Sequence, residues 1–416
     1  MICASGAELG RAEWRALVDE WLSSRALGRR VLIVPPDDSR CHSYAGEMTA
    51  YLYERLHAAH DVHVMPAVGT HAQMSASAKA RFFPNVPAEA FLEHDWRRDA
   101  ETLGEIASET VERATGGRCL GAICVQLNRR VARGEFDEVL SIGQVVPHEV
   151  VGMANYTKNL LVGLGGREMI NRSHMIGAIC GLESCMGKTE TPVRALLDDA
   201  QERFLNALGV TFFLSVVAND ASGARLRGLF IGEKREAFEA AAQLSQQLNV
   251  TTLERRVRRV VTYLDPAEFR SLWVGNKAIY RTRMAIADGG ELLVIAPALR
   301  QCGENEEADA LIRRYGYCGT PSVLKLYREH AFDGMEMVAA HLIHGSGEGR
   351  FRIVYATDPA LMPAEEIKAL GFGWADARDA LARYRPQERE TGFYNDENGA
   401  YYYVSSPALG LWRARD

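Results

Sequence analysis

The feature that most constrains the fold is an apolar run, Val31 to Val34, that ends directly in the polar loop Pro35-Pro36-Asp37-Asp38. An apolar run closed by a turn signal is typical of a strand buried on both faces, as in a parallel sheet. Helical periodicity predicts an amphipathic helix over Ala12 to Ser23, before this strand, and another helix over Met48 to Ala59, after it. The alternation of helix and strand predicts an α/β fold.

The same pattern recurs at a second predicted strand, Val62 to Pro66, which runs into the loop Val68-Gly69-Thr70-His71. Open parallel sheets bind ligands beyond the carboxyl ends of their strands, so both loops are candidates for a functional site. The remaining elements predicted in this half are helices over Ala100–Ala114 and Phe238–Leu248 and strands over Leu120–Gln126, Glu138–Ile142 and Val210–Ala218.

The length of 416 residues exceeds the roughly 100 to 200 residues of a usual domain, so we expect two domains. We place the boundary near residue 255. Residues 1–255 would form a catalytic, cofactor-binding α/β domain, and residues 256–416 a smaller α/β domain that closes over the substrate, with a cofactor cleft between them. The elements predicted in the second domain are helices over Lys277–Ala287, Asn305–Tyr315, Thr320–Phe332 and Pro363–Leu370, a turn at Asp288–Gly290, and strands over Glu291–Ala296 and Arg350–Ala356.

Charge and hydropathy narrow the class of partner. The net charge of −6 provides no basic field for nucleic acid or an anionic membrane. The longest apolar stretches, such as Val210 to Ala218, fall far short of the roughly 20 residues that span a bilayer. Met1 to Arg15 holds acidic residues and no apolar signal core. We therefore expect a cytoplasmic protein with a small-molecule substrate. The eight cysteines form no Cys-x-x-Cys pair, which favours reduced thiols in the core.

Three residues whose side chains could act in catalysis or bind a metal lie in one segment that is rich in Gly, Asn, His and Lys. They are His148, Lys158 and His174, separated by 10 and 16 positions. Each of them alone would more often be a hydrogen-bonded structural residue. Together with Asp37-Asp38-Ser39-Arg40 and Gly69-Thr70-His71, however, they form a five-part constellation in a fixed order.

This constellation resembles the lactate racemase family, whose pattern is an Asp-x-Thr-Arg loop, a Gly-Thr-His loop, and then His, Lys and His in this spacing. Ser39 stands where the family usually has Thr, which keeps the hydroxyl group. The resemblance covers Val31 to Ile176 and continues more loosely beyond. It implies an isomerase that inverts the hydroxyl-bearing carbon of a 2-hydroxy acid by removing and returning a hydride, through a 2-keto acid.

The resemblance also implies a cofactor, the nickel-pincer nucleotide, which is a pyridinium-3-thioamide-5-thiocarboxylic acid mononucleotide that carries nickel. Lys158 would be the residue able to hold it covalently, and His174 the protein ligand of the nickel. Sulfur and imidazole suit nickel, and a neutral lysine can act as a nucleophile. Cofactor-maturation enzymes would be partners. The remaining residues expected to bind the cofactor are Asp37, Ser39, Arg40, Gly163, Gly165 and Gly166, although a plain turn explains the glycines equally well.

Inversion at carbon needs an acid–base group on each face of the substrate. By the same resemblance His71 and His148 are that pair, and we expect each imidazole to titrate near neutrality. Arg40 would hold a carboxylate or alkoxide with its planar fork, and Asp37 would orient a histidine or the arginine. A strand-end ion pair between Asp37 and Arg40 is the structural alternative.

The chain departs from lactate-type members at two places. Ala154-Asn155-Tyr156-Thr157 replaces glycines before the lysine, and Tyr280-Arg281-Thr282-Arg283-Met284 replaces a Tyr-Gln-x-x-Lys pattern. The second stretch looks like that of the subgroup associated with sugar acids. We therefore predict epimerisation of D-gluconate and D-mannonate at C2, with Arg40, Tyr280 and Arg281 as substrate-binding residues.

Two alternatives stay open. One is a racemase of a smaller 2-hydroxy acid such as malate, lactate or a short aliphatic acid. The other belongs to a different class, a sugar-acid or nucleotide-binding protein that has kept the fold without turnover. His341 and His344 lie at a spacing that can bind metal, but no Cys or carboxylate motif accompanies them, which favours a structural or substrate-contact role.

Overall fold

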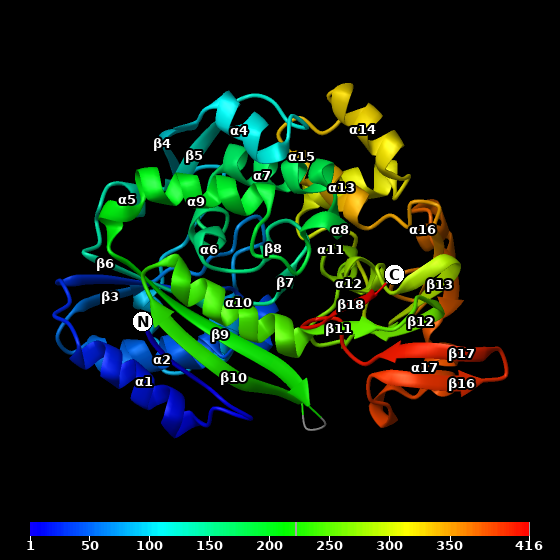
Figure 1. The fold of residues 1–416 in the computed structure, drawn as a ribbon, viewed down its shortest axis with the longest axis horizontal. Helices are drawn as coiled ribbons and strands as arrows, with labels where there is room; N and C mark the ends of the chain where they lie inside the picture. Colours follow the sequence, from blue (N-terminus) through cyan, green and yellow to red (C-terminus); the bar gives the residue numbers. More distant parts are fainter. Residues whose placement is uncertain (221–222, 416) are drawn as a thin grey trace. The chain divides into compact units, whose positions relative to one another are not determined.

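A six-stranded sheet in the order β1-β10-β9-β6-β2-β3 organises the first part of the chain (Figure 1). In this computed structural model, which describes residues 1–220 and 223–415, the chain divides into two units. The first is Met1–Cys180 with Cys185–Leu248, and the second is Gly181–Ser184 with Asn249–Asp416. The predicted α/β class is confirmed for both.

The centre of the first sheet is parallel. β2 (Arg30–Val34) lies between β3 (Asp61–Val64) and β6 (Glu138–Gln144), and β6 also pairs in parallel with β9 (Val210–Asp220). Val31 to Val34 are fully buried, as expected for a strand covered on both faces. β10 (Gly223–Gly232) and β1 (Ile2–Ser5) extend the sheet in antiparallel fashion.

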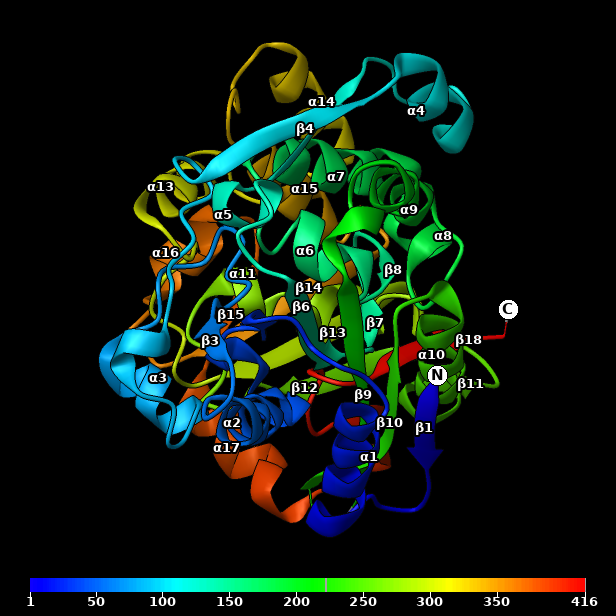
Figure 2. The same cartoon turned by 90° about the vertical axis from the view of Figure 1, so that its left-hand side faces the viewer.

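Helices cover both faces of this sheet, as Figures 1 and 2 show from two sides. Trp21 of α1 (Arg11–Ser23) packs edge-on against Phe213 of β9. Tyr156, just before α6 (Thr157–Leu161), packs against the neighbouring strand residue Phe212. Because consecutive side chains of a strand point to opposite faces, these contacts place α1 and α6 on opposite sides of the sheet.

The other elements of the first unit complete the two helix layers and their connections. They are η1 (Asp38–Ser43), α2 (Ala45–Leu56), α3 (Ala76–Phe82), η2 (Ala88–Ala90), β4 (Ala100–Ile106), α4 (Ser108–Thr115), β5 (Ile123–Asn128), α5 (Arg129–Ala132), β7 (Pro147–His148), β8 (Gly152–Met153), α7 (Arg167–Cys180), α9 (Pro192–Phe204) and η3 (Asn206–Leu208). α8 (Leu182–Cys185) and α10 (Arg235–Asn249) lie at the unit boundaries.

The second unit holds another six-stranded sheet, in the order β15-β14-β13-β12-β17-β16. Only β16 is antiparallel to its neighbour. Its strands are β12 (Val257–Tyr263), β13 (Ile286–Ala296), β14 (Phe351–Thr357), β15 (Gly373–Asp376), β16 (Gly392–Asp396) and β17 (Gly399–Val404), with β11 (Val250–Leu253) and β18 (Leu411–Ala414) in a separate pair. Its helices are α11 (Leu272–Gly275), α12 (Lys277–Thr282), α13 (Glu306–Tyr315), α14 (Thr320–Arg328), α15 (Glu336–His344), α16 (Ala364–Ala369), α17 (Ala377–Tyr384) and η4 (Pro386–Glu388).

Three sequence predictions were wrong, two of helices and one of a turn. The first half of the helix predicted over Ala100–Ala114 is strand β4, which pairs with β5, while only Ser108 onward is helical. Gly104 of this strand packs closely on Phe204, because a Cβ there would lie 2.5 Å from the ring. The helix predicted over Lys277–Ala287 ends at Thr282, and the predicted turn Asp288–Gly290 lies inside β13. Strand pairing overrides these local preferences, because β4 pairs with β5, and β13 pairs with both β12 and β14.

None of the eight cysteines, all of which lie in the described residues, forms a disulfide. The predicted core position is confirmed for Cys119, Cys180, Cys185 and Cys302, which are buried, and is wrong for the exposed Cys3, Cys41 and Cys318. Within the described residues, no helix is both long enough and apolar enough to cross a bilayer.

Candidate active site

The loop after β2 places a buried carboxylate at the carboxyl edge of the sheet. Asp37 is buried and begins η1, where its Oδ1 atom accepts hydrogen bonds from the backbone N–H and the hydroxyl of Ser39. Burial by itself would raise the pKa of Asp37, but the charge and hydrogen bond of His71 and the nearby Arg40 lower it far below its ordinary value. The carboxylate is therefore ionised at neutral pH.

The loop after β3 brings His71 onto this carboxylate. β3 pairs with β2, so their carboxyl ends lie side by side. Gly69 turns the chain with a positive φ of 56°, and its N–H donates to the carbonyl of Gly163 at 2.9 Å. The Nδ1 atom of His71 lies 2.6 Å from Oδ2 of Asp37. The carboxylate thus fixes the Nδ1–H tautomer, and Nε2 becomes the nitrogen that can accept a proton.

The end of β6 places His148 in the opposite tautomer. His148 is 4% exposed, and its Nδ1 atom accepts the backbone N–H of Val150 at 3.1 Å. The neutral ring therefore carries its hydrogen on Nε2. Burial lowers the pKa of His148 well below its ordinary value, and Lys158 and Arg40 add to this effect while Glu149 opposes it. The expected titration near neutrality fails for His148 because burial disfavours its charged form.

Lys158 is the second residue of α6, a helix that directly follows two residues in unusual backbone conformations. Asn155 and Tyr156 have φ angles of 68° and 59°. Burial lowers the pKa of Lys158 to about 8, mainly with the help of the Arg40 charge. A substantial fraction of the amine is therefore neutral at mildly alkaline pH, which is the form that acts as a nucleophile.

His174 lies on α7 with its ring orientation set by the helix itself. Its Nδ1 atom donates to the carbonyl of Ile170 at 2.7 Å, so Nε2 is the ring nitrogen that carries the lone pair. Burial lowers the pKa of His174 to about 4, so the ring is neutral at physiological pH. A neutral imidazole held by a backbone carbonyl is the usual state of a metal-binding histidine. The residues present thus fit a nickel-bearing group: His174 supplies an imidazole nitrogen and Lys158 an amine.

The structure brings these side chains together within the first unit. Besides the direct bond between Asp37 and His71, the charges of the set influence one another. The charges of Arg40 and Asp37 shift the pKa of Lys158, and those of Lys158 and His174 shift the pKa of His148. The charge of His71 shifts the pKa of His174. The residues so gathered are Asp37, Ser39, Arg40, His71, His148, Lys158 and His174.

The predicted glycines of the site have packing roles. A Cβ at Gly163 would lie 2.2 Å from the carbonyl of Asn159 and 2.6 Å from Ala67, and one at Gly166 would meet Gln126 at 2.5 Å. At Gly165 it would meet the carbonyl of Leu161 at 2.0 Å. These contacts explain why glycine stands at each position, and a contact with a phosphate remains a prediction.

Tyr280 and Arg281 lie in the second unit, on α12, and both are buried. Arg281 donates to the carbonyl of Gly410 at 3.2 Å. His341 of α15 lies in the core of the same unit, where it hydrogen-bonds with the hydroxyl of Tyr317 at 2.8 Å and stacks on Trp273. This arrangement favours the structural role for His341.

Sequence analysis missed Arg194, a fully buried arginine on α9. Its guanidinium donates to the carbonyls of Met153 and Asn155 and to the hydroxyl of Thr157, so it contacts the turn before Lys158. In the sequence, an arginine on an amphipathic helix is typical of a solvent-exposed face. The one signal in the sequence is that Asn155 and Tyr156 stand where glycines are expected, which indicates that the turn before Lys158 needs support from another side chain.

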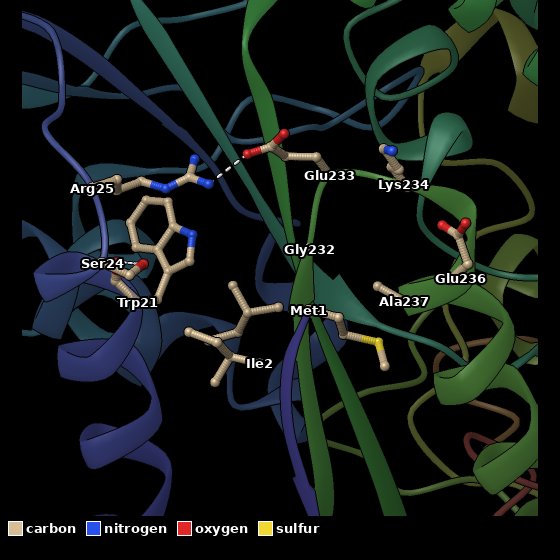
Figure 3. A pocket seen from close by; sticks show the side chains of 11 residues that line it. Met1, Ile2, Trp21, Ser24, Arg25, Gly232, Glu233, Lys234, Glu236 and Ala237 are labelled. Atoms are coloured by element: carbon tan, nitrogen blue, oxygen red, sulfur yellow. Dashed lines mark hydrogen bonds and ion pairs between the residues drawn. The ribbon is translucent and has the colours of Figure 1, made fainter.

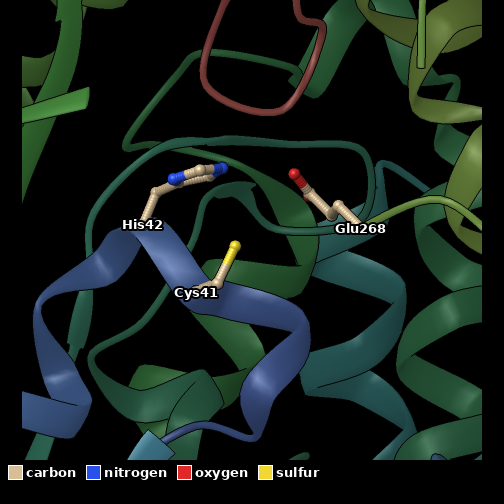
Figure 4. A group of neighbouring side chains, drawn as sticks. All are labelled: Cys41, His42 and Glu268. Carbon is tan, nitrogen blue, oxygen red and sulfur yellow. The ribbon is translucent and has the colours of Figure 1, made fainter. Parts of the chain in front are cut away.

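Two other features of the first unit carry side chains of potential interest. Cys41 and His42 follow Arg40 on η1 and are exposed (Figure 4). A pocket of about 460 Å³ lies beside β1, α1 and the end of β10, with an ion pair between Arg25 and Glu233 at its edge (Figure 3). The residues that line it include none of the predicted site residues.

The comparisons with known proteins bear on the same segment. Residues 19–186 match the family model of the lactate racemase N-terminal domain. This match to the lactate racemase N-terminal domain contains every residue gathered at the candidate site, from Asp37 to His174. No curated protein sequence gives a match.

Solved structures share the fold over most of the chain. A crystal structure of a Thermotoga maritima protein has a TM-score of 0.86 at 22% identity, covering 99% of this chain and 100% of that one. The lactate racemase apoprotein of Thermoanaerobacterium thermosaccharolyticum has a TM-score of 0.68 at 16% identity, covering 92% of this chain and 87% of that one. At these identities the likeness establishes the fold.

Proposed function

We propose that this protein is a nickel-pincer-nucleotide-dependent isomerase that inverts the hydroxyl-bearing carbon of a 2-hydroxy acid. The observation that carries the proposal is the gathering of Asp37, His71, His148, Lys158 and His174 into one group of interacting side chains. The match of residues 19–186 to the lactate racemase N-terminal domain supports the same reaction class.

Lys158 and His174 would hold the cofactor. When bound, this group supplies the chemistry that the side chains lack, namely acceptance of a hydride from carbon and its return. Lys158 offers an amine that burial keeps partly neutral, and His174 offers the Nε2 atom of a neutral ring. Asp37, Ser39 and Arg40 of η1 line the same site, and Arg40 would bind the substrate carboxylate with its planar fork.

The two histidines would handle the hydroxyl proton, and their tautomers differ. His71 has its Nδ1–H on Asp37 and so accepts a proton at Nε2, while the carboxylate stabilises the resulting imidazolium. His148 accepts a backbone N–H at Nδ1 and so presents a hydrogen at Nε2. In this state His71 is prepared as a base and His148 as a hydrogen-bond donor. For the opposite enantiomer, His148 would have to shift its hydrogen from Nε2 to Nδ1 before its Nε2 atom could take the hydroxyl proton.

We further propose a sugar acid as substrate, with D-gluconate and D-mannonate interconverted at C2. Arg281 and Met284 stand where lactate-type members carry Gln and Lys, which disfavours lactate. A polyol tail needs several hydrogen-bonding partners, and Tyr280 and Arg281 of α12 would supply two of them. A racemase of malate, lactate or a short aliphatic acid is the second candidate.

The test uses the protein produced together with the cofactor's maturation enzymes. D-Gluconate, malate and lactate that carry deuterium at C2 are incubated separately in ordinary water. A hydride mechanism retains deuterium at C2 of the inverted product, whereas proton abstraction at carbon would wash it out into the solvent. Inversion of malate without inversion of gluconate would replace the sugar-acid substrate, and deuterium-free product would overturn the hydride mechanism.

A further inference from the structure

Arg194 combines complete burial with three hydrogen bonds to one short turn. Its side chain donates to the carbonyl of Met153 at 2.6 Å and to the hydroxyl of Thr157 at 2.6 Å. A third bond reaches the carbonyl of Asn155 at 3.2 Å. Burying a guanidinium is costly unless its donors are satisfied. Both terminal nitrogens of Arg194 have acceptors in the turn, while its Nε has no hydrogen-bond partner among the described residues. The turn thus supplies all the acceptors that the side chain of Arg194 has.

The turn that Arg194 contacts follows an unusual backbone path. Asn155 has a φ of 68°, and Tyr156 has a φ of 59° with a ψ of −131°. L-residues rarely adopt these conformations, and two in succession need support from outside the turn. The rings of Phe212 and Phe238 pack against Tyr156. Arg194 stacks 4.6 Å above the ring of Phe238, so it packs with the same group.

The turn leads directly into the first residues of α6. Thr157 begins that helix and Lys158 follows it. The hydroxyl of Thr157 accepts from Arg194 and donates to Asp198 at 2.9 Å. Arg194 itself is fixed on α9, where its N–H donates to Thr191, the N-cap residue. A continuous set of bonds thus connects α9 to the helical turn that carries Lys158.

We propose that Arg194 is a positioning residue: it holds the turn of residues 153–157 in its positive-φ path and so sets the place of the Lys158 amine. This inference depends on the proposed function only in the role that it gives to Lys158. Among the described residues, Arg194 has no recorded hydrogen bond to the other candidate site residues. The positioning role explains why its charge is nevertheless buried. Lysine could not substitute, because its single nitrogen cannot reach acceptors that the guanidinium contacts from two separate nitrogens.

The reactivity of the Lys158 amine depends on where the amine lies. It is surrounded by charged and titratable groups from several elements: Asp37 and Arg40 of η1, His148 and Glu149 of the β7 segment, His174 of α7, and Arg194 of α9. Burial lowers its pKa to about 8. Movement of α6 would raise the pKa of Lys158 toward that of an exposed lysine. Less of the amine would then be neutral, and it would react more slowly at mildly alkaline pH.

The test is trace acetylation of the full chain by acetic anhydride at pH 8, without cofactor or substrate. Peptide mass spectrometry compares Lys158 with exposed Lys325. Arg194→Lys keeps the charge and removes the fork, and we expect it to lower the relative acetylation of Lys158 about tenfold. Arg203→Lys, an exposed position on the same helix, is the matched control. Unchanged labelling in Arg194→Lys would overturn the proposal.

A second pair of variants separates positioning from general support of the fold. Tyr156→Gly permits the positive φ without strain. We expect Arg194→Lys to change labelling less than about twofold when glycine is already present at 156. An equal loss in both backgrounds would mean that Arg194 only stabilises the fold. Should Arg194→Lys melt at room temperature, Thr157→Val, which removes one acceptor, takes its place in the same cycle. Because no turnover is measured, failure of the proposed function leaves this outcome readable.

Discussion

The Nδ1 atom of His71 lies 2.6 Å from the Oδ2 atom of Asp37, which is buried and ionised. This pair joins the loops that follow two adjacent parallel strands, β2 and β3. A carboxylate in this position fixes the tautomer of the imidazole and stabilises its protonated form. His71 is therefore the better prepared base of the two proposed histidines.

Asp37→Asn should disable this base while leaving the fold intact. The amide keeps the shape of the carboxylate but cannot stabilise an imidazolium, so we expect kcat for inversion to fall by about 10² or more. Steady-state kinetics of the cofactor-loaded enzyme measures this loss. Asp38→Asn, which changes the exposed neighbour, serves as control. Equal kcat values for the two variants would remove Asp37 from the mechanism.

Lys158→Met should stabilise the cofactor-free protein at pH 7. The folded-state pKa of Lys158 is lowered from 10.5 to about 8 by burial, so the unfolded chain binds more protons between these values. The charged amine therefore destabilises the fold fully below about pH 8, and this penalty disappears as pH rises toward 10.5.

Urea unfolding at pH 7 and pH 10 measures this effect. We expect Lys158→Met to gain about 2 kcal/mol in the free energy of unfolding at pH 7 and much less at pH 10. Lys325→Met, at an exposed site, should leave the free energy of unfolding unchanged at both values. A gain that does not depend on pH would point to packing as its cause.

His174→Ala should reduce the nickel content of protein produced with the maturation enzymes. Removing a metal ligand or its support typically costs about 10- to 100-fold in metal affinity. Elemental analysis of the purified chain gives the ratio of nickel to protein, and thermal melting shows whether the fold is kept. His57→Ala changes an exposed histidine that directly follows α2, and this control should retain nickel. Full retention in His174→Ala would exclude His174 as the ligand.

Gly163→Ala should disturb the site through packing. The added Cβ would lie 2.2 Å from the carbonyl of Asn159 and 2.6 Å from Ala67, so α6 and the loop after β3 must move apart. We expect a loss of about 1–3 kcal/mol in the free energy of unfolding and reduced turnover. Gly392→Ala, where no atom lies within 4 Å of the added Cβ, is the comparison. Similar melting curves for both would contradict the close packing at Gly163.

The strands that build the site were predictable because their signals are local. Val31 to Val34 form a continuous apolar run, and such a run has few stable positions other than the middle of a covered sheet. Since parallel strands present their carboxyl ends at one edge, the loops after β2, β3 and β6 had to lie near one another. β4 was not predictable, since Ala100 to Ile106 has helix-forming residues and is extended only because it pairs with β5.

The sequence alone determined the α/β class, the order of the site residues along the chain and the chemical types available to them, because periodicity and spacing depend on local backbone geometry. The tertiary structure decided which proton each imidazole carries, how far burial shifts the pKa values of His148, Lys158 and His174, and that Arg194 supports the turn before Lys158. Those properties depend on which groups surround a side chain and how much water reaches it. Residues distant in the sequence set both conditions, and they become neighbours only when the chain folds.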